Sequence, residues 1–362
     1  MATHQDTVHQ TMHPSNPSAS KSTSKSTTKQ ELVKQASGDI TLPFEKMHGL
    51  GNDFVLLPQT TINEINLLAP ENKPVLEKLA RFLCDRHFGI GADGLILAGP
   101  PVNLPEADIR FIYLNSDGSW AEMCGNGIRC FARFAQRHNL VDKASFTAET
   151  LAGPISPTIN TDGTVTVNMG APVLEATQVP FESKLASPDG EKLPLAAQVF
   201  DLELSAGTPS LQKVRLMPVS MGNPHCIVFQ TDQSDYHQSN HAGHQNNLLS
   251  PAVFGPLLEV HPAFPEKTNV EFVEIQSKSH LKVTVWERGC GFTLACGTGA
   301  CATAVAAILQ NRCDNAVDIE LPGGILHIQW TPEPGSPVFM TGPAASVFAG
   351  NVHVPQSLFQ AD

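Results

Sequence analysis

The chain is poor in aromatic and in basic residues, and it contains no long apolar run. Aromatic side chains make up 6% of the 362 residues, and 23 Lys and Arg stand against 35 Asp and Glu, for a formal net charge of −12. Such an acidic chain lacks the basic surface that non-specific nucleic-acid binding requires. A membrane-spanning helix needs about 18 or more apolar residues in succession, and no such run occurs. We therefore expect a small-molecule substrate, with neither nucleic acid nor membrane as partner.

Cysteine occurs eight times, but no pair has the Cys-x-x-Cys spacing of common zinc sites. No signal peptide is recognisable, so we expect a cytoplasmic protein with reduced thiols and not a disulfide scaffold. Six of the thiols are expected to be small buried hydrophobic side chains, namely Cys84, Cys130, Cys226, Cys290, Cys301 and Cys313. We predict neither a metal nor a cofactor.

Residues 1–41 are rich in Ser, Thr, Gln and Lys and contain no aromatic residue. Because such a segment buries too little apolar area to offset the entropy of ordering it, we predict a disordered N-terminal extension. A Ser-rich transit peptide is the alternative. The absence of Arg and the presence of Asp6, Glu31 and Asp39 weigh against it.

The remainder alternates between short strands and fewer helices, in a similar order in each half. Apolar periodicity predicts helices over 73–88 and 251–260. Strands are predicted over 43–48, 55–57, 95–97, 109–114, 164–168, 214–219, 226–229, 270–275 and 281–286. The pattern predicts two α+β domains related by duplication, with a catalytic cleft between them.

Two segments of the second half look inserted. Residues 182–207 are polar and predicted to be irregular, and residues 230–250 contain His237, His241 and His244 among Gln, Asn and Ser. A histidine cluster can bind metal, but in a low-complexity loop it is more often solvated.

Two tetrapeptides with the pattern Cys-Gly-x-Gly are the most informative feature. Cys124-Gly125-Asn126-Gly127 and Cys296-Gly297-Thr298-Gly299 each open a stretch that is predicted to be a helix. A cysteine at a helix N-terminus lies at the positive end of the macrodipole, which favours the thiolate. The glycines let backbone N–H groups approach an anion closely. Facing each other, the two units would hold a carboxylate between two sulfurs.

Such an arrangement suits the exchange of an α-hydrogen without pyridoxal phosphate. The carbanion formed would delocalise into the carboxylate, which fixed dipoles at two helix ends can stabilise. One sulfur must be thiolate and the other thiol, so the two should titrate as a coupled pair.

The motifs together resemble the diaminopimelate epimerase family, cofactor-independent enzymes that interconvert LL- and meso-diaminopimelate in the synthesis of lysine and peptidoglycan precursors. The resemblance runs from Phe44 to about Val354. It rests on five segments, namely Met47-His48-Gly49-Leu50-Gly51-Asn52-Asp53-Phe54, Cys124-Gly125-Asn126-Gly127-x-Arg129-Cys130, Gly222-Asn223-Pro224-His225, Trp286-Glu287-Arg288-Gly289 and Ala295-Cys296-Gly297-Thr298-Gly299-Ala300.

The resemblance implies a fold of two pseudo-symmetric domains, each a mixed sheet or barrel around one long central helix. We expect the first domain over 42–168, completed by a C-terminal return over 341–354, and the second over 169–340. The family is usually a homodimer, so a homodimer is expected.

The resemblance also implies which residues form the site. Cys124 and Cys296 match the catalytic pair. The positions that match substrate-binding residues are Asn52, Gly94, Asn115, Gly125, Asn126, Asn223, Asn269, Glu287, Arg288, Gly297 and Thr298. Gly94 stands where some members carry a substrate-contacting glutamine, and Phe292 and Leu294 replace residues that are polar in many members.

The roles of His225 and Glu287 stay open at this point. Both could move protons on and off the thiols. Equally, His225 could cap a turn, while Glu287 could pair with Arg288 or with a substrate ammonium.

Other functions can be weighed against epimerisation. A proline racemase usually carries His after the first Cys-Gly, where this chain has Asn126, and the phenazine-type isomerases lack the cysteine pair. A thiol redox sensor would use Cys124 and Cys296 as a reversible disulfide, but it leaves Arg288 without a role. A non-catalytic amino-acid-binding protein requires the repeated tetrapeptide to be coincidence.

Overall fold

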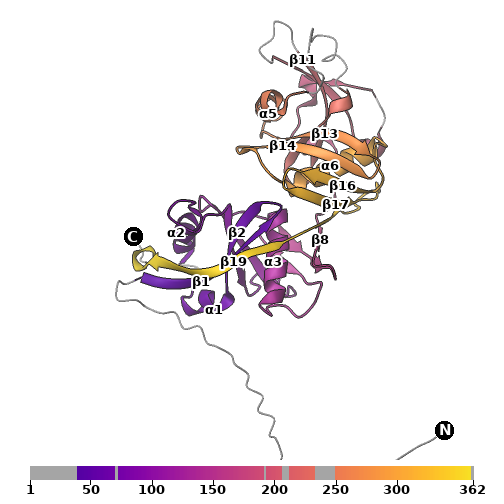
Figure 1. The fold of residues 1–362 in the computed structure, drawn as a ribbon. Helices are drawn as coiled ribbons and strands as arrows, with labels where there is room; N and C mark the ends of the chain where they lie inside the picture. Colours follow the sequence, from indigo (N-terminus) through magenta and orange to yellow (C-terminus); the bar gives the residue numbers. More distant parts are fainter. Residues whose placement is uncertain (1–38, 70–71, 191–192, 206–211, 233–248, 360–362) are drawn as a thin grey trace, which may run out of the picture.

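The computed structural model describes residues 39–69, 72–190, 193–205, 212–232 and 249–359. The predicted extension falls almost wholly outside this range, as do His237, His241 and His244. Two halves follow one another along the chain, each built on a sheet with one long central helix (Figure 1). The predicted α+β architecture is confirmed.

The first sheet has seven strands in the order β19-β1-β2-β3-β4-β5-β6. Its pairs are mixed, since β2 and β3 are parallel whereas β1 and β2 are antiparallel. The strands are β1 (Asp39–Gly49), β2 (Asn52–Leu57), β3 (Gly94–Gly99), β4 (Ile109–Asn115), β5 (Ala148–Thr150), β6 (Gly153–Ile155) and β19 (Ala345–Pro355). The last strand of the chain thus lies beside the first, as the yellow and indigo ribbons show (Figure 1).

The second sheet has twelve strands in the order β7-β8-β18-β17-β16-β14-β13-β12-β11-β10-β9, with β15 paired to β14. Its strands are β7 (Pro157–Ile159), β8 (Val165–Asn168), β9 (Ser187–Pro188), β10 (Phe200–Leu204), β11 (Gln212–Ser220), β12 (Pro224–Phe229), β13 (Asn269–Ser277), β14 (His280–Glu287), β15 (Gly291–Phe292), β16 (Ala316–Leu321), β17 (Gly324–Gln329) and β18 (Phe339–Gly342). Two pairs near the middle of this order are parallel, β12–β13 and β14–β16.

Helices cover the sheets and divide the core. The α-helices are α1 (Gln59–Glu64), α2 (Lys73–Cys84), α3 (Gly125–Arg137), α5 (Pro251–Glu259) and α6 (Gly297–Leu309). On β2, Phe54 and Leu56 belong to the same apolar cluster as α3, while Val55 and Leu57 belong to that of α2. Successive side chains of a strand point to opposite faces, so a strand covered on both faces reads as a continuous apolar run.

The helix α6 is buried on nearly all sides, and its sequence explains why. Its thirteen residues are almost all Gly, Ala, Cys, Thr, Val, Ile or Leu. A helix that is apolar all round belongs in a core. It therefore carries Cys296 at its N-terminus into the interior of the second half.

Three of the differences from the predicted elements have a clear physical cause. Helix α2 ends at Cys84, before the predicted Phe88, because the Asp85 carboxylate accepts the backbone N–H groups of His87 and Phe88 at 2.7 and 2.8 Å in a turn. Strand β1 begins at Asp39, because β19 extends to Pro355 and supplies its partners. Strand β10 lies in the segment predicted to be irregular, since Phe200, Leu202 and Leu204 alternate inward within a polar stretch.

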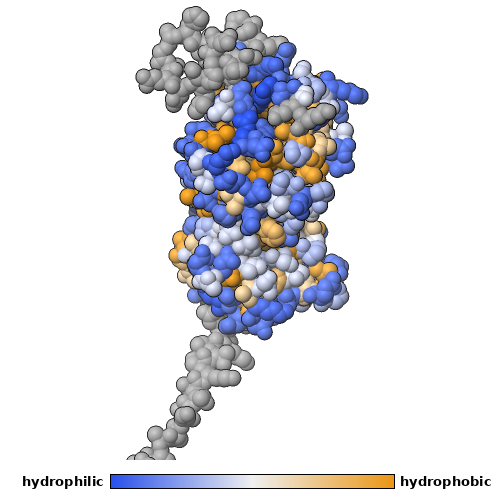
Figure 2. Space-filling view, turned by 90° about the vertical axis from the view of Figure 1, so that its right-hand side faces the viewer, coloured by the Kyte–Doolittle hydropathy of each residue, from blue (hydrophilic) through white to orange (hydrophobic). Residues whose placement is uncertain are grey.

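In the space-filling view, the face shown is mostly hydrophilic and is interrupted by small hydrophobic groups (Figure 2). No helix in the described ranges is both long enough and apolar enough to cross a membrane.

Candidate active site

Both cysteines of the repeated tetrapeptide cap the helices that they precede. Cys124 and Cys296 have extended backbones, and α3 and α6 begin at the next residue. Each sulfur accepts the backbone N–H three residues on, from Gly127 and Gly299 respectively, at 3.4 Å in both cases. A side-chain acceptor at this position satisfies an N–H that the helix leaves unpaired. The predicted cysteine-headed helices are confirmed.

The N-termini of α3 and α6 meet. A Cβ placed on Gly125 would lie 3.9 Å from the Cα of Gly297, and the converse distance is 3.7 Å. The sulfur of Met340 would lie 3.2 Å from a Cβ on Gly297. A Cβ on Gly125 would likewise lie 3.1 Å from the Cε of Met340, so at both positions the tight contact is with Met340, and glycine leaves it room where the two helix ends approach. Two positive helix ends therefore converge on one place, where an anion is favoured.

The side chain of Asn126 bridges the two halves of the molecule. Its Nδ2 donates to Asn52 Oδ1 at 3.2 Å and to the carbonyl of Ala295, the residue before Cys296, also at 3.2 Å. Asn52 Oδ1 in turn lies 3.6 Å from the sulfur of Cys124. The resemblance implied a backbone contact with substrate for Asn126. The structure adds that its side chain links the two halves through hydrogen bonds.

Arg129 is fully buried beneath the first tetrapeptide. Its guanidinium donates to the carbonyls of Gly125 at 3.0 Å and Pro343 at 3.2 Å, and to Asn126 Oδ1 at 2.8 Å. The sequence motif contained this arginine without giving it a role. The structure shows that it holds the Cys124 loop against the segment that leads into β19.

Polar and acidic groups surround the sulfur of Cys296. Thr298 Oγ1 lies 3.5 Å from it, and the carboxylate of Glu287 is close enough to raise the pKa of the thiol. The Thr293 hydroxyl donates to Glu287 Oε1. These contacts place Glu287 where it can exchange a proton with Cys296.

His225 and Glu271 form a buried pair on the same side of the site. His225 Nδ1 lies 2.7 Å from Glu271 Oε1, and Nε2 lies 3.1 Å from Asn223 Oδ1. Both side chains are completely buried, and Glu271 Oε2 has no hydrogen-bond partner among the described residues. Glu271 is buried because both faces of this strand are covered, with Val273 in the apolar cluster of α6 and with Val270 and Phe272 in another.

The ligand atoms of His225, Glu271 and Cys296 lie within 4.8 Å of one another. Imidazole, carboxylate and thiolate are all groups that zinc accepts. This trio is where the described residues could hold a metal, and the expected absence of one stays a prediction.

Burial controls the acidity of the three central groups. Loss of solvation raises the pKa of both the Cys124 and the Cys296 thiol, while the backbone N–H groups at the helix ends act in the opposite direction. For Cys296 the nearby carboxylates of Glu287 and Glu271 raise the pKa further. Burial also raises the pKa of Glu287. The helix ends therefore work as predicted, but burial outweighs them.

Asn269 and Arg288 lie next to the His225 turn. Asn269 Oδ1 accepts the backbone N–H of Arg288 at 3.0 Å, and its Nδ2 donates to the carbonyl of Pro224 at 3.1 Å. The exposed Arg288 guanidinium donates to the Glu266 carbonyl at 2.9 Å. His225, Asn269 and Arg288, three of the predicted site residues, therefore lie together in the second half.

Gly94 and Asn115 are paired across β3 and β4 on the first half. A side chain on Gly94 would collide with the ring of Tyr113. Asn115 Nδ2 donates to Ser119 Oγ at 2.9 Å within its turn. Gly94 can therefore offer only its backbone here.

The side chains of Phe292 and Leu294, which precede Cys296 in the chain, are 53% and 52% exposed. Leu294 lies over Gly51, where an added Cβ would be 2.6 Å from its Cδ1 and where φ is +88°. Leu294 therefore forms a contact between the two halves near Cys296, whereas Phe292 packs edge-on against Trp286 in the second half.

Five of the six thiols predicted to be buried are buried. The prediction for Cys290 is wrong, because this residue is exposed in the turn between β14 and β15.

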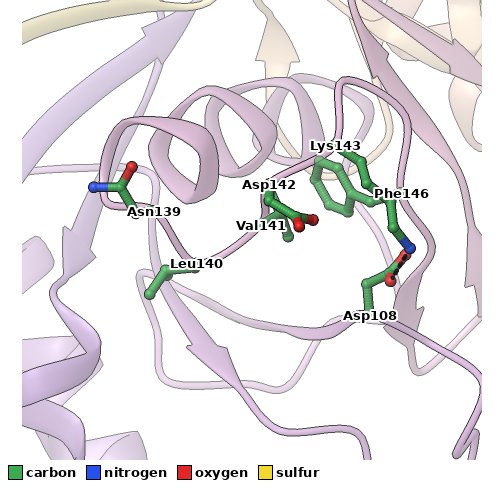
Figure 3. Close-up of a pocket in the computed structure, with 7 residues that line it drawn as sticks. All are labelled: Asp108, Asn139, Leu140, Val141, Asp142, Lys143 and Phe146. Carbon is green, nitrogen blue, oxygen red and sulfur yellow. Dashed lines mark hydrogen bonds and ion pairs between the residues drawn. The ribbon is translucent and has the colours of Figure 1, made fainter.

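A surface pocket of about 310 Å³ opens at the other end of α3 (Figure 3). Its walls include Leu140, Val141 and Phe146, with Lys143 paired to Asp108 at 2.8 Å. None of the predicted site residues lines it. The two cysteines of the tetrapeptides lie instead at the N-terminal ends of α3 and α6.

A family model described as diaminopimelate epimerase matches residues 44–175 and 217–347. A diaminopimelate epimerase from Desulforudis audaxviator (strain MP104C) is 47% identical over 312 residues, covering 85% of this chain and 98% of that protein. A chloroplastic diaminopimelate epimerase from Oryza sativa subsp. japonica is 44% identical over 320 residues, covering 88% and 82%.

Solved structures at low identity share the fold. A hydroxyproline epimerase from Agrobacterium vitis has a TM-score of 0.55 at 16% identity, covering 86% of this chain and 92% of that one. A methylitaconate-delta-isomerase has a TM-score of 0.56 at 15% identity, covering 90% and 98%. These neighbours support the two-domain architecture, and the sequence relatives decide the family. The chain belongs to the diaminopimelate epimerase family.

Proposed function

We propose that this chain interconverts LL-2,6-diaminopimelate and meso-diaminopimelate by two-base proton transfer without pyridoxal phosphate, in lysine and peptidoglycan-precursor synthesis. The observation that carries the proposal is the meeting of two cysteine-capped helix N-termini at Gly125 and Gly297. A carboxylate between them would receive backbone N–H groups from both helices, which stabilise the charge that develops when the α-hydrogen leaves.

One sulfur removes the α-hydrogen and the other returns a proton to the opposite face of the carbon. The C–H electron pair remains on the carbon and delocalises into the carboxylate, so no electron acceptor is needed. The attacking sulfur ends as thiol and the donating sulfur ends as thiolate. The reverse reaction starts from that state with the roles exchanged.

Glu287 and His225 support the second sulfur in this proposal. Glu287 lies near the Cys296 thiol, and because burial raises its own pKa it can exchange a proton with that sulfur. His225 is held between Asn223 and Glu271. We therefore assign it the role of balancing the charge of the acidic groups around Cys296.

Distal recognition is assigned to Asn52, Asn115, Asn223, Asn269 and Arg288. A guanidinium can clamp a carboxylate with two N–H groups, and an Asn amide offers both a donor and an acceptor to an amino-acid head group. Arg288 bonds to Asn269 through its backbone N–H, and its guanidinium is exposed and donates to the Glu266 carbonyl, which favours a role at the unreacting centre.

We infer that the active unit is a homodimer. Strand β19 is the edge of the seven-stranded sheet, and Val347 and Phe348 on it are 55% and 49% exposed. An apolar edge strand is a ready template for a second copy. Sedimentation of Val347→Glu should give a lighter species than the unchanged protein, and an unchanged mass would exclude this edge.

We also infer domains over 42–168 with 341–354, and over 169–340, with the site between them. The packing of α3 against β7 and β8 supports this division, although β8 hydrogen-bonds to β18. For location we propose the cytoplasm. Fractionation of cells that make the full chain would test this, because the rice relative is named chloroplastic.

Proton NMR in deuterated water tests the function. Reduced protein should erase the α-hydrogen signal of LL-diaminopimelate and form the meso isomer, whereas Cys124→Ala and Cys296→Ala should not form it. Cys290→Ser is the matched control, because it removes an exposed thiol outside the proposed pair. Absence of exchange by folded, reduced protein would overturn the proposal.

A further inference from the structure

A hydrogen-bonded row of four side chains passes the sulfur of Cys124. Arg129 donates to Asn126 Oδ1 at 2.8 Å, Asn126 Nδ2 to Asn52 Oδ1 at 3.2 Å, and Asn52 Nδ2 to Asp93 Oδ2 at 2.7 Å. The two ends have fixed polarity, because a guanidinium only donates and a carboxylate only accepts. Each of the two amides therefore has one orientation that satisfies the row.

The orientation of the Asn52 amide matters for Cys124. Its carbonyl oxygen lies 3.6 Å from the sulfur and can accept the S–H. An amide turned over would present its NH₂ group to the sulfur, and a donor there favours the thiolate. The amide thus biases the sulfur towards one protonation state.

Asp93 is itself held from outside the site. Its Oδ1 accepts from Arg86 at 2.7 Å, and its Oδ2 also accepts the backbone N–H of Asp53 at 3.0 Å. The Asp53 carboxylate pairs with the same Arg86 at 2.9 Å and with Lys46 at 2.8 Å. The acceptor that meets Asn52 is therefore fixed before any substrate arrives.

We propose that Asp93 is a positioning residue for Cys124, whose carboxylate fixes the Asn52 amide with the carbonyl oxygen, and not the NH₂ group, towards the sulfur. Asp93 acts through Asn52. The inference rests on the proposed function only in taking Cys124 as an acid–base group. The amide orientation and its effect on the thiol require no substrate.

Other titratable groups near Cys124 are Arg129 on α3, Glu287 at the end of β14 and Tyr113 on β4. They stay unchanged in the variants below. A change in Cys124 reactivity then traces to Asp93, either through the Asn52 amide or through its charge, and the choice of variants separates these two.

The test measures alkylation of Cys124 by iodoacetamide against pH, in a Cys290→Ser/Cys296→Ala background, with peptide mass spectrometry. Asp93→Ala removes the acceptor and should speed alkylation near neutral pH by about threefold to tenfold, because the thiol loses one hydrogen bond. Asp93→Asn has no charge but keeps a carbonyl oxygen for Asn52, so its rate should stay close to that of the background.

Asp53→Ala is the matched control, because it removes a neighbouring carboxylate that pairs with the same Arg86 as Asp93, without touching the Asn52 side chain. Its rate should also match the background. The proposal is overturned by an unchanged rate in Asp93→Ala, by Asp93→Asn behaving like Asp93→Ala, or by Asp53→Ala behaving like Asp93→Ala.

Asn52→Leu covers the case in which Asp93→Ala fails to fold. This near-isosteric change removes the acceptor at the sulfur directly and should raise the alkylation rate by a similar factor. An unchanged rate would overturn the proposal. No step uses diaminopimelate, so failure of the epimerase proposal would appear in the NMR exchange and leave this result standing.

Discussion

At the scale of single residues, Gly299 shows how tightly the buried acid is enclosed. A Cβ at this position would lie 2.5 Å from Glu271 Oε1, and that carboxylate is completely buried against His225. Gly299→Ala would improve helix propensity by about 1 kcal/mol at an open site. Here we expect the steric overlap with Glu271 to outweigh the gain in helix propensity. The net result should be a loss of about 1–3 kcal/mol in unfolding free energy and slower epimerisation.

Gly127→Ala is the matched control for that prediction, since Gly127 has the same place in α3. Its Cβ would meet Cys124 Cβ and Ile96 Cδ1 at 3.3 Å and Phe54 Cζ at 3.5 Å, and no carboxylate is among these three nearest atoms. Urea unfolding should show a smaller loss for this variant. Equal losses in the two variants would mean that the carboxylate is not responsible.

Glu287 is predicted to lower the stability of the folded protein at neutral pH while it supports catalysis. Burial raises its pKa, so the folded protein binds a proton more tightly than the unfolded chain. The folded state is therefore penalised as pH rises above the ordinary value of 4.5. Glu287→Gln should raise the melting temperature at neutral pH and not below that value.

The same substitution should lower the epimerisation rate by roughly 100-fold and remove the acid limb of the pH profile, because general-base help is lost. Melting curves and exchange rates across pH check both parts. A variant with the wild-type pH profile would exclude Glu287 from proton handling.

Motifs located the residues that we assign to catalysis and substrate binding, but not the residues that hold them in place. Cys124, Cys296 and the asparagines stand in recognisable turns. Glu271 was missed because an isolated acid in a strand has no local signature. Its burial depends on α6, far along the chain. The bonds of Arg129 to Pro343 likewise depend on a segment that is distant in sequence.

At the scale of elements, the opposed N-termini of α3 and α6 predict a reversible inactivation. A thiol-specific oxidant such as diamide should join Cys124 to Cys296, abolish activity, and be reversed by dithiothreitol. Bound diaminopimelate should slow the loss, because it would lie between the sulfurs. Peptide mapping under non-reducing conditions identifies the bridge.

Cys290→Ser is the informative control for oxidation, because Cys290 is exposed and outside the pair. It should inactivate at the rate of the unchanged protein. If substrate gave no protection, the sulfurs would not flank its binding place.

Most helices and strands could be predicted where periodicity was local, as for α5 and β14. Element ends were harder, because they depend on partners. The Asp85 turn ends α2, because the Asp85 carboxylate accepts two backbone N–H groups. The first residues of β1 are part of the strand because β19 supplies their pairing partners. Strand β10 was missed because its three inward apolar side chains lie within a polar segment, where so short an alternation gives little signal.

At the scale of the whole molecule, buried thiols predict an alkaline limit to stability. Burial raises the pKa of Cys130 and Cys301, one on each central helix, to about 12, against an ordinary value of 9.0. Their contribution is intact below pH 9.0 and is lost as pH rises towards 12. Each thiol should cost about 1.4 kcal/mol per pH unit inside that window.

Urea unfolding in reductant at pH values on either side of 9.0 measures this slope. Cys301→Ala removes one of the two groups and should flatten it. An unfolding free energy that stays constant across the window would contradict the prediction.

The pairing of the last strand with the first has a consequence for synthesis on the ribosome. β1 leaves the ribosome early, yet its outer partner β19 is among the last segments to emerge. The first half, begun first, is therefore completed last. Until then one edge of β1 stands open on the nascent chain, and a premature stop near the C-terminus would damage the half made at the beginning.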